Sequence, residues 1–142
     1  MQSATQISEL DEQIQKTQID LANAREQENT GQILVNLRKL GQLFLDGGDA
    51  PQALTHYNEA LKLVADTEDK EAHSQILGFR GVALKLIGNY SLALQSFRKS
   101  NAVAASISHA ALMIDSYIQI AMIKSEMGET TEAISNLSRA MA

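Results

Sequence analysis

The sequence predicts an all-α fold built from antiparallel helix hairpins, on three observations. The 142 residues include one proline, no cysteine and no tryptophan, and they are rich in residues that mostly favour helices. A pattern of small and large residues recurs every 40 positions. Each repeat has a glycine near its middle, and in two repeats a helix-capping residue follows it. A chain of this length can bury about two-thirds of its unfolded surface, so we expect one domain or one repeat array.

The repeat appears as three segments that align at a constant offset of 40. They begin at Leu37 (LRKLGQLFLDGGDAPQALTHYNEAL), Leu77 (LGFRGVALKLIGNYSLALQSFRKSN) and Tyr117 (YIQIAMIKSEMGETTEAISNLSRAM). Five columns hold similar residues: Gly41, Gly81 and Ala121; Gly48, Gly88 and Gly128; Ala53, Ala93 and Ala133; Tyr57, Phe97 and Leu137; and Ala60, Ser100 and Ala140. Chance does not align five such columns, so the chain is a repeat protein.

Each column has a physical reason. A glycine in the middle of a helix costs about 1 kcal/mol relative to alanine, so the first column predicts a close approach of two helices. The alanine column supplies the facing small surface on the second helix. The large residue one turn later is expected to fill the space between neighbouring hairpins.

The glycines of the second column predict the end of the first helix in each hairpin, where a left-handed backbone is needed. Asp49 and Asn89 follow as N-caps, and Pro51 lies in a first helical turn, whereas the segment 129–131 caps less clearly. These signals predict first helices near 32–46, 71–87 and 110–127 and second helices near 50–67, 90–106 and 130–142. Because the turns are short, paired helices must be antiparallel.

An offset of 40 also predicts a helix near 9–27, within an acidic N-terminal segment 1–30. The first 28 residues carry a net charge of −4. Apolar residues fall on one face of this helix, and Thr17 dilutes the stripe; the stripe comprises Ile7, Leu10, Ile14, Leu21 and Ala24. We expect this helix to dock as a cap on three hairpins at about 31–69, 70–108 and 109–142; the alternative is a frayed helix or linker.

At these positions the chain resembles the tetratricopeptide repeat family, whose signature alternates small and large residues across a helical hairpin. The matching residues are Leu37, Leu40, Gly41, Phe44, Ala53, Tyr57 and Ala60; Leu77, Gly81, Leu84, Ala93 and Phe97; and Tyr117, Ile120, Ala121, Ala133, Leu137 and Ala140. The resemblance covers roughly residues 34–142 and implies a right-handed solenoid of about three repeats plus the N-terminal helix.

The sequence departs from this family in several ways. Its period is 40, whereas the family's is about 34, and Ala65 and Ala105 replace the proline that normally closes a repeat. It looks like an extended subclass found in scaffold and signalling proteins. Arg80 and Lys124 stand where the signature expects apolar residues, so we expect local exposure or packing of their methylene stems.

The last helix is expected to present an uncovered apolar face, because no following helix covers Ile134, Leu137 and Met141. From this we expect that the chain is a fragment of a longer protein or that two copies associate through the C-terminal helix.

No catalytic or cofactor-binding motif is present. The histidines His56, His73 and His109 lack the spacing of a metal site, and we expect them to be solvated or to cap helices. Gly47 and Gly48 lack the pattern of a phosphate loop, and acidic residues 68–71 fall in a predicted loop. We therefore expect no enzyme activity, no metal and no cofactor.

Charge and hydropathy limit the partners and the compartment. The formal charge is −5, which is the wrong sign for neutralising nucleic-acid phosphates. No apolar run approaches the roughly 20 residues of a membrane span. We therefore expect neither a nucleic-acid nor a membrane partner. The absence of cysteine fits a reducing compartment, and the cytoplasm is the default.

The resemblance implies a concave groove lined by the first helix of each hairpin. The groove residues are Val35, Arg38, Gln42, Leu45, Gln75, Gly78, Val82, Lys85, Asp115, Ile118, Met122 and Ser125. Family members that bind acidic C-terminal peptides use a carboxylate clamp; here Arg38 alone could serve, because the other clamp positions carry Gln42, Phe79, Asp115 and Gln119.

The groove residues suit a partner's amphipathic helix or extended segment with apolar anchors, because Val82, Ile118 and Met122 are apolar and Gly78 is small. The alternative is that these residues pack within the array. The leading hypothesis for function is a non-catalytic scaffold that binds a protein or peptide partner. The alternative is a regulatory or sensor region of a larger multidomain signalling protein.

Overall fold

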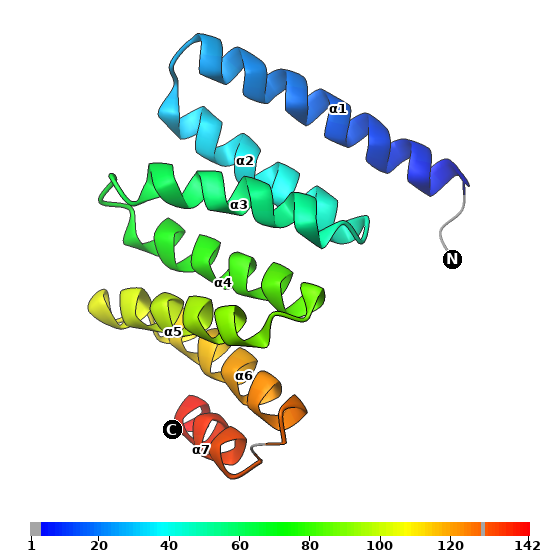
Figure 1. Ribbon diagram of the computed structural model, residues 1–142. Coiled ribbons are helices and arrows are strands. Elements are labelled where there is room, and N and C mark those ends of the chain that lie inside the picture. The colour runs from blue at the N-terminus through cyan, green and yellow to red at the C-terminus, as the bar shows by residue number, and fades with distance from the viewer. Residues whose placement is uncertain (1–3, 129) are drawn as a thin grey trace. The chain divides into compact units, whose positions relative to one another are not determined.

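The computed structural model describes the backbone of residues 4–128 and 130–142 and the side chains of residues 9–128 and 134–142. These residues form seven helices, and the predicted all-α class is confirmed (Figure 1). The helices are α1 (Ala4–Glu26), α2 (Thr30–Asp46), α3 (Ala50–Val64), α4 (Lys70–Ile87), α5 (Tyr90–Ser106), α6 (Ala110–Glu126) and α7 (Thr130–Met141). Every predicted boundary lies within 3 residues of the observed one, except that α1 begins 5 residues earlier.

The chain forms two compact units. Unit 1 is Met1–Asp66 and unit 2 is Thr67–Ala142. In unit 1, α2 packs against both α1 and α3; in unit 2, α4 packs on α5, α5 on α6 and α6 on α7. Consecutive helices therefore form hairpins, as the short turns predict. Within the described residues, no helix is long and apolar enough to cross a membrane.

An aromatic ring lies directly against a glycine in two hairpins. A β-carbon added at Gly41 would lie 2.5 Å from Cζ of Tyr57, and one added at Gly81 would lie 2.7 Å from Cε1 of Phe97. Both aromatic residues are buried, with at most 1% of their surface exposed. Each ring therefore occupies the space left by the missing β-carbon within its own hairpin, a contact that the expected packing between neighbouring hairpins did not include.

The third hairpin varies this pairing. Ala121, which has the β-carbon that the glycines lack, is buried, and Leu137 replaces the aromatic residue and is 40% exposed. An added methyl group on one helix thus accompanies a smaller side chain on the other. The predicted small surface is confirmed at Ala53 and Ala93, which are fully buried, and Ala133 lies outside the described side chains.

The predicted turns are confirmed. Gly48, Gly88 and Gly128 have φ angles of +80°, +92° and +81°. Asp49 accepts a hydrogen bond from the amide of Gln52, and Asn89 caps α5 in the same way. The weaker cap expected at residues 129–131 involves residue 129 and the side chains of 130 and 131, which lie outside what the structure describes.

The turns that precede α2 and α6 adopt a positive φ angle at residues other than glycine. Glu28 and Ser108 have φ angles of +53° and +52°. Each precedes a residue whose side chain caps the next helix, Asn29 for α2 and His109 for α6. Because neither turn contains glycine, the glycine signal could not reveal these turns.

Helix α1 packs along α2. Leu21 and Ala24 are 5% exposed, and Thr17, which was expected to interrupt the apolar stripe, is 1% exposed. The Thr17 hydroxyl donates to the carbonyl of Gln13 at 2.7 Å, so it can be buried at little cost. The side chain of Ile7 lies outside the described residues.

Three other expectations concern exposure. Lys124 is 9% exposed and Arg80 is half-buried, so of the two expected arrangements, packing of the methylene stems fits better than local exposure. Their methylene stems can cover apolar surface. On α7, Ile134 is 59% and Met141 is 83% exposed, as expected for that face.

The contact between Gly81 and Phe97 gives a stability prediction. Gly81→Ala is expected to lower the free energy of unfolding by about 1–3 kcal/mol, because the new methyl group overlaps the ring. The double variant Gly81→Ala, Phe97→Leu copies the pair at 121 and 137, and we expect it to be more stable than Gly81→Ala alone. Urea unfolding followed by circular dichroism measures both.

The matched control is Gly78→Ala, one turn earlier in the same helix, where a β-carbon would meet only Ser100 Oγ at 3.7 Å. It is expected to leave stability unchanged or to raise it by up to about 1 kcal/mol. A Gly81→Ala protein as stable as this control would contradict the account.

Tyr57 gives a pH prediction. Burial raises its pKa to about 12 from the ordinary value of 10; nearby Arg38 lowers the pKa and Asp46 raises it. Between these two values the folded protein retains a proton that the unfolded chain loses, so stability is intact below pH 10 and falls as pH rises toward 12. Tyr57→Phe, which keeps the ring, should lose this part of the decline in alkaline urea titrations. A difference in stability between the two proteins that stays constant over that range would count against a buried, neutral Tyr57.

Candidate functional site

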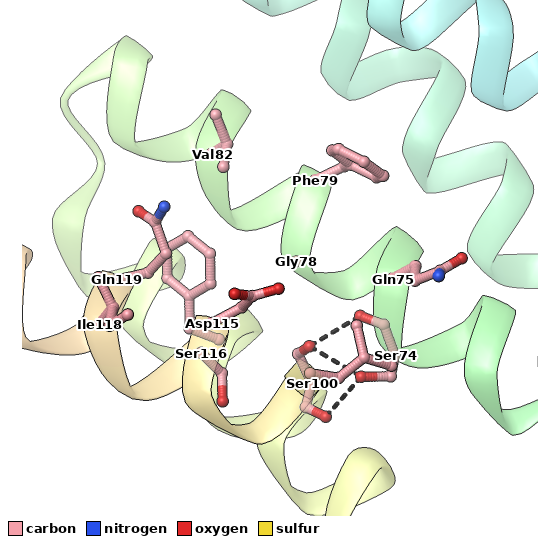
Figure 2. Close-up of a pocket in the computed structure, with 12 residues that line it drawn as sticks. Ser74, Gln75, Gly78, Phe79, Val82, Ser100, Asp115, Ser116, Ile118 and Gln119 are labelled. Carbon is pink, nitrogen blue, oxygen red and sulfur yellow. Dashed lines mark hydrogen bonds between the residues drawn. The ribbon is translucent and has the colours of Figure 1, made fainter. Parts of the chain in front are cut away.

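Unit 2 contains a cleft between α4 and α6, with α5 behind it (Figure 2). Its volume is about 240 Å³. The lining residues are Ser74, Gln75, Gly78, Phe79 and Val82 of α4, Phe97 and Ser100 of α5, and Leu112, Asp115, Ser116, Ile118 and Gln119 of α6. This cleft is the candidate site, because residues predicted for the groove contribute to its lining.

The back of the cleft is closed by a serine pair. The Ser74 hydroxyl donates to the carbonyl of Ser100 at 2.9 Å, and the Ser100 hydroxyl donates to the carbonyl of Ser74 at 2.7 Å (Figure 2). Both residues are at most 4% exposed. Because each hydroxyl is satisfied within the pair, this surface joins α4 to α5 and leaves no hydroxyl donor unpaired.

Gly78 opens the cleft. Unlike Gly41 and Gly81, it has no ring against it, and a β-carbon there would make ordinary contact with the Ser100 hydroxyl alone. Its φ angle is not positive, and it lies within α4, where glycine is disfavoured. Neither close packing nor backbone conformation therefore requires glycine here, and its absent side chain leaves room between the helices.

The two facing walls are largely apolar. Val82 lies one turn beyond Gly78 on α4, and Leu112 and Ile118 lie on α6. Val82 and Leu112 are half-buried and Ile118 is 37% exposed, so their surfaces are available at the cleft. Such partly exposed apolar walls favour an apolar ligand group.

A hydrogen bond joins the two walls. Lys85 Nζ donates to Gln119 Oε1 at 2.9 Å. Since Lys85 belongs to α4 and Gln119 to α6, this bond links the two helices. Lys85 itself does not line the cleft.

The structure brings together five of the predicted groove residues of unit 2. These are Gln75, Gly78, Val82, Asp115 and Ile118. Met122, which is 45% exposed, and Ser125 lie further along α6 and outside the cleft lining.

The other predicted groove residues belong to α2 in unit 1. Val35 is 55% exposed, and Arg38 and Leu45 are half-buried. Gln42 donates to Asp46 Oδ1 at 2.9 Å, so its side chain is held along its own helix.

Sequence reasoning missed the polar residues at the back of the cleft, Ser74, Ser100 and Ser116. The available signal was Ser100, which stands in a column where the other repeats have Ala60 and Ala140. A hydroxyl at a buried small position needs a partner, and its partner here is the backbone of Ser74. Ser116 donates to the carbonyl of Met113 at 2.8 Å.

The histidines have structural roles. His109 Nδ1 accepts from the amide of Leu112 at 3.3 Å, which confirms the expected capping role. His56 lies 2.7 Å from the carbonyl of Gln52 and stacks on Phe44. Burial, and then Lys70, lower the pKa of His73. Among the described side chains no cluster of three or more potential metal ligands occurs.

Comparison with known proteins supports the repeat fold. A family model described as tetratricopeptide repeat matches residues 31–106, and a second with the same description matches residues 114–142. The chain belongs to the tetratricopeptide repeat family. The predicted resemblance is thus confirmed. Tetratricopeptide repeats generally form non-catalytic scaffolds, and the fold supports a role in protein interaction.

Two solved structures show the same tetratricopeptide fold. The crystal structure of the TPR domain of Arabidopsis FLU has 23% identity and a TM-score of 0.75, and the match covers 79% of this chain and 94% of that one. The crystal structure of BtubC from P. vanneervenii has 17% identity and a TM-score of 0.77, with 98% of this chain covered. The chain spans 56% of BtubC. No curated protein sequence matches the chain.

Proposed function

We propose that this chain is a protein-interaction module that binds an apolar segment of a partner protein in the cleft between α4 and α6. The observation that carries the proposal is Gly78, whose missing side chain leaves the cleft open although neither packing nor backbone conformation requires glycine there. A glycine that costs helix stability and only opens a surface is best explained by a ligand.

The size and lining of the cleft support a peptide ligand. Its volume of about 240 Å³ is below the roughly 300–1,000 Å³ typical of pockets for drug-sized molecules. It therefore suits one or two side chains of a polypeptide. The reciprocal hydrogen bonds of Ser74 and Ser100 leave the back of the cleft with no hydroxyl that a ligand must pair.

The ligand would be an amphipathic helix or an extended segment. Either form presents apolar side chains at regular spacing, and one such anchor can enter between Val82 and Ile118. The carboxylate clamp for acidic tails is missing, which favours an apolar anchor over an acidic one.

Substitutions that fill or charge the cleft test this proposal. Peptides are first selected from a random dodecapeptide display library on the wild-type chain, and their affinities are measured by fluorescence anisotropy. Gly78→Leu fills the cleft and is expected to weaken binding at least about tenfold, or about 1.4 kcal/mol. Val82→Asp is expected to weaken it similarly, because it places a charge in an apolar wall.

Two controls separate binding from folding. Gly78→Ala adds one methyl group without a clash, takes up little of the cleft, and should weaken binding less than Gly78→Leu does. Leu92→Asp changes an exposed apolar residue in the first turn of α5, outside the cleft, and should bind as the wild type does. Circular dichroism and urea midpoints check that every variant folds. Selected peptides that bind Gly78→Leu as tightly as the wild type, or a library that yields no binders, would disprove the proposal.

A further inference from the structure

We propose that the segment bound in the α4/α6 cleft carries a lysine or arginine next to its apolar anchor, and that Asp115 pairs with this cation. This inference rests on the proposed function and specifies the class of segment. Its starting point is that Asp115 is the one residue with a formal charge among the cleft-lining residues.

Asp115 is placed to meet a ligand. It lies on α6 with Leu112 and Ile118, one turn from each. Its side chain is exposed, and Figure 2 shows its carboxylate directed from α6 toward the space beside Gly78. A side chain that inserts beside Gly78 therefore comes next to this carboxylate.

The other polar groups of the cleft already have partners. The two back serines bond to each other, and Ser116 donates to the carbonyl of Met113 and accepts from Asn101. Gln119 accepts from the Lys85 ammonium group at 2.9 Å. Gln75 also has an interaction partner.

Asp115 differs from all of them. No hydrogen bond or ion pair joins its carboxylate to another side chain within residues 9–128 and 134–142. It is therefore a charged group of the cleft lining that remains available to a partner.

Binding an apolar segment over these walls would remove water from Asp115. A carboxylate that loses water without gaining a partner is costly, so an uncharged apolar segment is penalised. An acidic segment would also be repelled. A lysine or arginine beside the anchor compensates for the lost hydration, and charge complementarity therefore selects a basic and apolar segment.

Charge exchange at this position tests the inference. Random dodecapeptide libraries are selected in parallel on the full chain, on Asp115→Asn and on Asp115→Arg. Lysine and arginine are expected to be enriched in peptides from the wild type, to show no enrichment with Asp115→Asn, and to be replaced by aspartate and glutamate with Asp115→Arg. Glu68→Arg, which makes the same charge change before α4, is the control and should select the same peptides as the wild type.

A synthetic peptide from the wild-type selection gives the quantitative test. Replacing its basic residue with methionine is expected to weaken binding to the wild type by about fivefold or more, and to have little effect on binding to Asp115→Asn. Equal losses on both proteins, or the same residue preferences in all selections, would overturn the inference. A dimer of the wild type that Asp115→Arg dissociates in sedimentation velocity would also overturn it, because a second copy would then occupy the cleft.

The two proposals fail in different ways. Peptides that show no charge preference but lose affinity for Gly78→Leu would reject the role of Asp115 and retain the cleft as a binding site. Peptides that bind Gly78→Leu unchanged would reject the cleft itself, and the role of Asp115 with it.

Discussion

The contact between an aromatic ring and a glycine is the interaction on which each of the first two hairpins depends. The rings of Tyr57 and Phe97 lie where a β-carbon of Gly41 or Gly81 would stand, so the two helices approach closely along this contact. Burying such a ring contributes several kcal/mol and offsets the roughly 1 kcal/mol cost of a helical glycine. The spacing of the paired helices, and of every side chain they carry, follows from this contact.

The contact between Phe97 and Gly81 also shapes the cleft. Phe97 packs on Gly81 and also lines the cleft, so one side chain links the core of the α4/α5 hairpin to the candidate binding surface. The reciprocal bonds of Ser74 and Ser100 hold α5 against α4. Ser100 lies one turn from Phe97, and Ser74 lies two turns from Gly81. With the back held in place, the missing side chain of Gly78 creates space that neighbouring residues do not fill. A preformed cleft reduces the ordering cost of binding a segment.

Most of the fold could be predicted from the sequence because its signals are local. The glycines with positive φ and the caps at Asp49 and Asn89 placed helix ends closely, whereas α3 ended earlier than expected at Val64, where no glycine marks the end. The cleft could be predicted in part, since helical spacing gives the direction of each side chain but not the depth of packing. The repeat column singled out Gly81 for close packing and the family resemblance assigned Gly78 to the groove, but neither signal showed that the space beside Gly78 is left unfilled.

The central claim is that an apolar segment enters the cleft beside Gly78. The most direct measurement is a two-dimensional amide NMR titration of the full chain with a selected peptide, which reports binding residue by residue. The largest chemical-shift changes are expected on Gly78, Val82, Asp115 and Ile118, and residues of the first turn of α5 are expected to change little. Changes that instead gather on α2 or α7 and leave Gly78 unaffected would contradict the claim.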